Sequence, residues 1–400
     1  MKTFIRMMSY YIYVIMTNLK FTRAILMIYI LNQGVSIVEF SIIQIVFNLV
    51  KILSNFPTGV ISDYIKRKQS IAIGATLNGI VFLIIYLISL YNVNNHFWLF
   101  MILFSLNAIG TSFMMESDQA LLYDYLVKNG RKDDYVKIFS RKEVLATAFL
   151  TLGTVITGYV SEISLAIPFL MQAVTFFIAS YAILSFPEEK KPSEDSRRPK
   201  ILEIAIHGIQ YVRNSSKIIM LIVFLALVVA STDGVVMFTQ GYFDDIGMSM
   251  KLIGYIYSGS TLLSMLASLL SQKVNQLKLV NIVSLVFGLF VVGIGMLMTH
   301  NYWIISIGFL IVYITIDLIE PPILGLLNNE VPNEIRTTIL SLLGTIRNAI
   351  AMALYLVYGV VSQVSGYHSM YLVLGLIIFV SFIGIYYYYF RFVNCSNKII

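Results

Sequence analysis

The chain has 400 residues, of which 58% are hydrophobic and only 12% are charged, and its formal net charge is +7. A water-soluble domain carries about 25% charged residues, so this composition excludes a soluble globular protein and indicates that lipid covers much of the surface. The single cysteine, Cys395, excludes an intrachain disulfide.

Apolar runs of about twenty residues follow one another along the chain. Each can cross the roughly 30 Å hydrocarbon core of a bilayer as an α-helix, and each is too long and too evenly apolar for a strand of a membrane barrel. The sequence therefore predicts an all-α membrane protein with twelve transmembrane helices. The predicted spans are residues 10–31, 37–56, 70–90, 97–122, 144–163 and 165–186, then 218–243, 252–270, 279–299, 303–327, 339–361 and 370–393.

A charged segment with several prolines divides these spans into six and six. Residues 187–200 read PEEKKPSEDSRRPK, which is typical of a linker. We therefore expect an N-terminal half over residues 1–186, a cytoplasmic linker over 187–217 and a C-terminal half over 218–400. Within the linker, residues 201–216 favour either an amphipathic helix on the membrane surface or an extension of the next span.

A short echo links the two halves. Gly34-Val35-Ser36 recurs as Gly247-Met248-Ser249, in each case directly after the first span of its half. Together with the division into six and six, the echo fits parallel repeats related by an axis along the membrane normal.

The basic residues are distributed unequally between the two sides of the membrane. If the N-terminus is cytoplasmic, 23 of the 28 Lys and Arg residues fall in cytoplasmic segments, whereas the opposite loops hold only Lys251. This asymmetry predicts that both termini are cytoplasmic. It also explains the positive net charge without a nucleic-acid partner.

The turn between the second and third spans carries the sharpest motif. Residues 59–68 read GVISDYIKRK, which resembles the G-x-x-x-D-x-x-x-R-K signature of the major facilitator superfamily, with Lys66 in place of its second glycine. The resemblance implies two six-helix bundles and a conformational latch formed by Gly59, Asp63, Arg67 and Lys68. The alternative is that the basic residues only set the membrane orientation.

Two acidic residues could belong to the same latch. Glu116 and Asp118 lie near the cytoplasmic end of the fourth span. Asp63 and Arg67 are four residues apart and can pair at the membrane surface, and one of the two acids could join them.

Other segments resemble a bacterial branch of that superfamily whose members are often described as drug exporters. They are residues 120–126 and 327–341, together with Pro57-Thr58 before the signature turn. Two features of many proton antiporters are missing: the fourth span has Asn107 and Gly110 in place of an Arg, and the fifth has no Gly-Pro pair. The resemblance therefore supports transport more firmly than export.

Ionisable side chains inside the apolar runs cost about 3 kcal/mol each, so their positions are informative. In the superfamily, the first, fourth, seventh and tenth helices line the central cavity. In this chain the same four spans contain Lys20 and Arg23, Glu116 and Asp118, Asp233, and Asp317 and Glu320, and only Lys51 and Arg347 lie well inside other spans.

We expect Lys20, Arg23, Asp233, Asp317 and Glu320 to bind protons or substrate. Lys20 with Arg23, and Asp317 with Glu320, are three residues apart and share a helix face. A carboxylate between helices could exchange its proton for substrate. The alternative is that the acids form static pairs with Lys20 and Arg23 that hold the halves in register.

Two features bear on the rest of the mechanism. Pro321 and Pro322 predict either a hinge in the tenth span or the end of its helix. The sequence contains no G-x-x-x-x-G-K phosphate loop, and its four histidines are scattered singly, so we expect no catalytic residue, cofactor or metal site.

The expected function is secondary active transport by alternating access, most simply proton-coupled efflux of small amphipathic or antibiotic-like molecules. One alternative is a transporter of a nutrient, sugar, peptide or organic anion, and another is a membrane sensor that does not transport. We expect a monomer in the plasma membrane whose partners are a small-molecule substrate, protons and lipid, without nucleic acid.

Overall fold

The computed structural model describes residues 2–91, 96–188, 210–332 and 335–393. These residues are helices and short connections, and no strand occurs among them. They form two compact units. The first contains Met1–Glu194 and Phe243–Thr261, and the second contains Asp195–Tyr242 and Leu262–Ile400.

The first unit is built around a layer of long helices. α5 packs against α3 and α4, α7 packs against α4, and α1 packs against α6 and α7. The helices are α1 (Lys2–Asn18), α2 (Leu26–Asn32), α3 (Ile37–Tyr64), α4 (Arg67–Ile88), α5 (Phe97–Lys128), α6 (Tyr135–Ser161) and α7 (Ile167–Leu184), with a short 3₁₀ turn at Lys132–Asp134.

The second unit contains the remaining helices. They are α9 (Ser216–Asp245), α10 (Met250–Val274), α11 (Leu279–Leu297), α12 (Tyr302–Glu330) and α13 (Arg336–Tyr388), followed by a π-helical turn at Tyr389–Val393. The last turn of α9 and the first part of α10 cluster with the first unit. α11 packs against α12 and α13.

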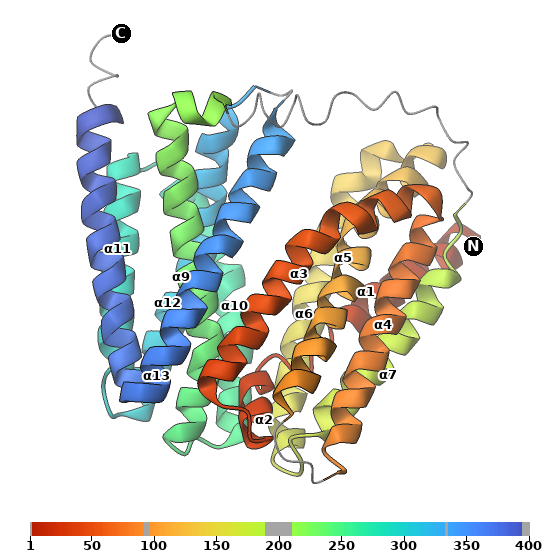
Figure 1. The fold of residues 1–400 in the computed structure, drawn as a ribbon. Helices are drawn as coiled ribbons and strands as arrows, with labels where there is room; N and C mark the ends of the chain where they lie inside the picture. Colours follow the sequence, from red (N-terminus) through yellow and green to blue (C-terminus); the bar gives the residue numbers. More distant parts are fainter. Residues whose placement is uncertain (1, 92–95, 189–209, 333–334, 394–400) are drawn as a thin grey trace. The chain divides into compact units, whose positions relative to one another are not determined.

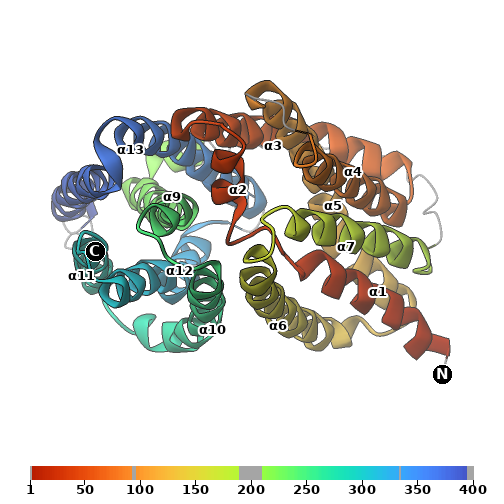
Figure 2. The same ribbon diagram turned by 90° about the horizontal axis from the view of Figure 1, so that it is seen from below.

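The predicted all-α membrane fold is confirmed. Ten helices in the described part of the chain are long and apolar enough to cross a membrane. One of them, α13, is two helices joined at Gly366, where φ is 82° and ψ is 170°, and Figures 1 and 2 show the chain doubling back there. The first predicted span is also present, divided into α1 and α2, which brings the membrane-crossing segments to the expected twelve.

The sequence echo marks the same joint in each half. Gly34 and Gly247 have φ values of 81° and 78°, a left-handed conformation that costs glycine little and that ends many helices. Ser36 then caps α3, since its side chain accepts from the N–H of Glu39 while the Glu39 carboxylate accepts from the N–H of Ser36. Ser249 likewise accepts from the N–H of Leu252 at the start of α10.

Two expectations about chain breaks have different outcomes. α12 continues through Pro321 and Pro322 to Glu330, so the alternative that the prolines end the helix is wrong. The expected amphipathic helix over residues 201–216 lies mostly outside the described residues, as do residues 189–200 of the linker. The domain boundaries at the linker therefore stay a prediction.

Glycines allow α4 and α5 to approach each other closely. A Cβ atom at Gly74 of α4 would overlap the carbonyl oxygen of Gly110 in α5, and one at Gly110 would overlap the side-chain oxygen of Asn78. Backbone atoms cannot move aside as the end of a flexible side chain can. The two helices are therefore locked in register by the absence of side chains at these positions.

We predict that Gly74→Ala lowers the free energy of unfolding by about 2 kcal/mol, because overpacking against backbone strains the helix pair. The measurement is denaturant unfolding in mixed micelles. Gly288→Ala in α11 is the control, because no described atom lies within 4 Å of the added Cβ and alanine is the better helix former. Equal stability of the two variants would contradict this packing account.

Candidate functional site

The first predicted span is interrupted in its middle by a stretch without regular helix. Residues 19–25 connect α1 to α2, and Figure 2 shows the coil between them. The N–H of Phe21 donates to Gln172 Oε1 at 2.8 Å, and the Phe21 carbonyl accepts from Thr157 Oγ1 at 2.7 Å. Side chains of α6 and α7 therefore replace two hydrogen bonds that a continuous helix would have made itself.

Gly153 of α6 makes room for this break. A Cβ atom at Gly153 would come within 3.2 Å of the backbone nitrogen of Lys20 and within 3.3 Å of Leu19. The coil therefore lies directly on α6, and residues of α6 and α7 in its own unit hold the break in place.

Three cations of the first unit lie near the break. Lys20 interacts electrostatically with Arg23 and with Lys51 of α3, and its side chain is exposed. Arg23 Nη1 donates to Thr261 Oγ1 at 2.8 Å, a contact within the first unit. The structure thus brings together the two predicted residues Lys20 and Arg23, and it adds Lys51, to which the sequence assigned no role.

Three acids of the second unit form the other group of intramembrane charges. Asp233 of α9 pairs with Arg347 of α13, with 2.8 Å between Oδ2 and Nη2. Glu320 of α12 interacts electrostatically with Arg347, Asp317 and Asp233. The predicted acids therefore share one site, and its cation comes from the eleventh span.

Further groups of the same unit surround these acids. Ser264 of α10 donates to Asp317 Oδ2 at 2.5 Å. The phenol of Tyr355, eight residues after Arg347 in α13, interacts electrostatically with Asp233. The Asp233 and Arg347 side chains are 38% and 39% exposed. Charges at this depth cannot face hydrocarbon without a large cost, so we infer that their exposed parts meet water.

The signature turn makes contacts that the motif did not predict. Arg67 Nη1 lies 3.2 Å from Asp124 Oδ2 of α5. The Glu188 carboxylate accepts from the backbone N–H groups of Arg67 and Lys68 at 2.9 and 2.8 Å, where the start of α4 favours negative charge. Lys68 Nζ donates to the carbonyls of Leu184 and Phe186 at the end of α7.

The other latch candidates are placed less completely. The side chains of Asp63 and Glu116 lie outside the described residues, so the expected pairing of Asp63 with Arg67 stays a prediction. No described atom lies within 4 Å of a Cβ built at Gly59. Its close contact, which the motif implies, is therefore not seen in the described part of the chain.

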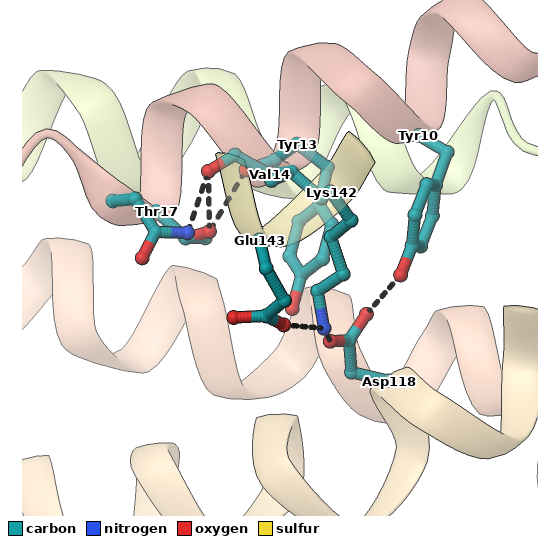
Figure 3. A network of polar contacts seen from close by, with 8 residues as sticks. Tyr10, Tyr13, Val14, Thr17, Asp118, Lys142 and Glu143 are labelled. Carbon is teal, nitrogen blue, oxygen red and sulfur yellow. Dashed lines mark hydrogen bonds and ion pairs between the residues drawn. The ribbon is translucent and has the colours of Figure 1, made fainter. Parts of the chain in front are cut away.

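Asp118 belongs to a separate polar network at the same end of the unit. Its Oδ1 accepts from the Tyr10 hydroxyl of α1 at 3.0 Å, and its Oδ2 lies 2.6 Å from Lys142 Nζ of α6 (Figure 3). Lys142 also lies 3.8 Å from Glu143. The Asp118 and Lys142 side chains are only 15% and 11% exposed, so this network joins α1, α5 and α6 in a largely buried setting.

Sequence reasoning missed several of these partners. Gln172 and Thr157 lie more than a hundred residues from Phe21, which they bind. Asp124 lies in a segment that the sequence marked only by its resemblance to a bacterial branch, and Lys142 was counted only for membrane orientation. Arg347 could have been found, because an Arg in the middle of an apolar run requires a partner.

The chain belongs to the Major Facilitator Superfamily, whose sequence model matches residues 3–356. This membership places it among transporters rather than enzymes and confirms the resemblance that its signature turn indicated.

One relative by sequence is the uncharacterized MFS-type transporter YxaM of Bacillus subtilis (strain 168). It is 21% identical over 265 residues, and the match covers 63% of this chain. This chain spans 65% of the length of that relative.

Solved structures with the same fold cover nearly the whole chain. The nucleoside transporter NupG has a TM-score of 0.78 at 12% identity, covering 94% of this chain and 98% of its own. A bacterial homolog of the human lysosomal transporter Spinster, inward-facing and occupied, has a TM-score of 0.75 at 10% identity and 98% coverage of both chains. A D-xylose-proton symporter has a TM-score of 0.69 at 14% identity, with coverages of 95% and 97%. At these identities the likeness shows the fold alone.

We predict that Lys142→Met lowers the free energy of unfolding by about 3 kcal/mol, because it leaves the buried Asp118 carboxylate without its cation. The double variant with Asp118→Asn should lose less than the sum of the two single changes, since no unpaired charge remains. Denaturant unfolding in mixed micelles measures both. The control is Lys137→Met, an exposed position of the same helix, and additive losses in the cycle would argue against this coupling.

Proposed function

We propose that this protein is a secondary active transporter that couples the movement of a small solute to protons by alternating access. The observation that carries the proposal is the group formed by Asp233, Asp317 and Glu320 with Arg347 in the second unit. Membrane-embedded acids at such positions mark proton and substrate pathways.

The charge balance of this group supports proton binding. Three carboxylates share one guanidinium, and Glu320 is repelled by both Asp233 and Asp317. Binding of a proton to one carboxylate removes part of that repulsion, and release restores it. The Asp233–Arg347 ion pair is accessible, and it can open when substrate or a proton binds.

The direction of transport has two candidates. Export of amphipathic or antibiotic-like molecules is supported by the motifs that resemble bacterial drug exporters. Uptake of a nutrient is supported by the fold shared with a nucleoside transporter and a D-xylose-proton symporter. The cations Lys20, Arg23 and Lys51 also suit a polar solute better than an apolar one.

The proposed setting is the plasma membrane, with a monomer whose two termini are cytoplasmic. The asymmetry of Lys and Arg between alternate loops supports this orientation. In this orientation the Arg67–Asp124 pair and the Asp118 network lie at the cytoplasmic ends of α4 and α5. We propose that they brace one conformation of the first unit during the transport cycle.

The test is substrate-dependent proton flux in proteoliposomes that enclose a pH-sensitive dye. Cationic dyes, antibiotics, nucleosides, sugars and organic acids are screened under an imposed pH gradient. We predict that Asp233→Asn reduces the proton flux driven by the active compound at least tenfold, because it removes a charge that must be exchanged. Asp317→Asn and Glu320→Gln identify which carboxylate carries the proton.

The Asp233→Asn variant should fold, because the pair it removes is more than one third exposed and such pairs contribute about 1 kcal/mol or less. Asp134→Asn is the control, since that acid pairs with Arg131 on the surface. Wild-type flux in all three intramembrane variants would refute proton coupling through this site. If the wild-type protein binds a compound without any flux, the result would instead favour the alternative of a membrane sensor that does not transport.

An accumulation assay in intact cells separates the two directions. Dissipating the proton gradient in intact cells abolishes accumulation of an imported nutrient, whereas it raises retention of an exported compound.

A further inference from the structure

We propose that His300 and His368 of the second unit form a binding site for a divalent transition-metal ion such as Zn²⁺, with one nitrogen of each imidazole as a ligand. His300 lies in the connection from α11 to α12, and His368 lies in α13 just after Gly366. The sequence shows the two histidines singly, and the fold brings them together. The inference does not depend on the proposed transport function.

The joint in α13 places His368 beside the α11–α12 connection. Gly366 has a φ of 82°, a left-handed conformation that glycine adopts without strain and that lets the chain double back there. The ring centroids of His300 and His368 are 5.1 Å apart. His300 is exposed and His368 is half-buried, so an ion in solution can reach the pair.

The separation of the two rings fits a shared metal ion. Zinc binds imidazole nitrogen at about 2.0–2.1 Å in a tetrahedral arrangement, which puts the centroids of two imidazoles on one ion about 5 Å apart. The observed 5.1 Å matches this spacing. No group of three or more His, Cys, Asp or Glu side chains suited to a metal occurs in the described part of the chain. We therefore assign two protein ligands, with water completing the coordination.

A chain of hydrogen bonds orients the His368 ring. The Tyr242 hydroxyl of α9 donates to the carbonyl of Thr299 at 3.4 Å, and it also lies 3.4 Å from Nε2 of His368. Because a hydroxyl has one hydrogen, Tyr242 accepts from His368, and Nε2 carries the proton of the neutral ring. The lone pair is then on Nδ1, where it can bind a metal ion. Histidine ligands are commonly oriented by such a hydrogen bond from their other ring nitrogen.

Aromatic packing fixes Tyr242 in turn. Its side chain is buried, and its ring centroid lies 5.6 Å from that of Tyr367 and 5.5 Å from that of Tyr371. The His368 ring lies edge-to-face with Tyr242 at 5.5 Å. One of the two ligands is therefore held in place before the metal binds, which lowers the entropy cost of binding.

The experiment is isothermal titration calorimetry on the purified full chain, without a histidine tag, in an uncharged detergent. Zn²⁺ is compared with Mg²⁺ and Ca²⁺, because imidazole nitrogen suits zinc whereas the other two ions prefer oxygen ligands. We expect one saturable site for Zn²⁺ that Mg²⁺ and Ca²⁺ do not fill. Absence of saturable Zn²⁺ binding would overturn the proposal, as would a site that takes Mg²⁺ equally well.

Variants of the two histidines test the ligands. His300→Ala and His368→Ala should each weaken Zn²⁺ binding at least tenfold, and the double variant should show no site. His207→Ala, which removes an imidazole from the predicted linker, is the control and should bind as the wild type does. If His368→Ala does not fold, His300→Ala still tests the site, because that side chain is exposed. Wild-type affinity in His300→Ala would refute the assignment.

The electron paramagnetic resonance spectrum of bound Cu²⁺ counts the nitrogen ligands directly. We expect couplings to two nitrogens in the wild type and to one in His300→Ala. An unchanged spectrum in that variant would assign the metal to other groups and overturn the proposal.

The role of Tyr242 as a positioning residue has its own test. Tyr242→Phe should weaken Zn²⁺ binding about tenfold, since outer partners of a histidine ligand typically contribute that much or more. Tyr371→Phe is the control, because it removes a hydroxyl from the same aromatic cluster that bonds to Thr239, and it should keep the wild-type affinity. Equal losses in the two variants would show that Tyr242 acts only through general packing and would refute its positioning role.

Discussion

Hydrocarbon offers no partner to a backbone N–H or C=O group, and this constraint shapes every level of the structure. Long helices satisfy the backbone internally, which is why apolar runs of about twenty residues become helices whatever their detailed sequence. Serine and threonine within the spans follow the same rule, as when Ser41 donates to the Ile37 carbonyl and Thr111 to that of Asn107. Where the first span departs from helix, Gln172 and Thr157 provide the missing partners, so the irregular segment is kept at a specific place.

Charged side chains are also costly in hydrocarbon, and the intramembrane charges of the two units are arranged differently. In the second unit the acids Asp233 and Glu320 are gathered around Arg347, so most of the negative charge has a cation near it. In the first unit the cations Lys20 and Lys51 share a region with Arg23, and Arg23 donates a hydrogen bond to Thr261. The acids of the second unit are the group on which the proposed proton coupling rests.

The sequence predicts the helices well because run length and charge asymmetry are local properties. The echo around Gly34 and Gly247 also carries real information, since a left-handed glycine followed by a capping serine dictates the same joint in both places. The interruption near Phe21 could not be foreseen, because the groups that stabilise it, Thr157 and Gln172, lie more than a hundred residues away. The partner of Arg67 was missed for the same reason, as the motif drew attention to Asp63, four residues away, and not to Asp124.

The contact of Glu188 with the start of α4 has a consequence for the connection between the halves. Because its carboxylate binds the N–H groups of Arg67 and Lys68, the tether between the halves begins at this point and not at the end of α7. The chain therefore leaves the first unit beside the start of α4, and Glu188 compensates the positive end of that helix at the same point.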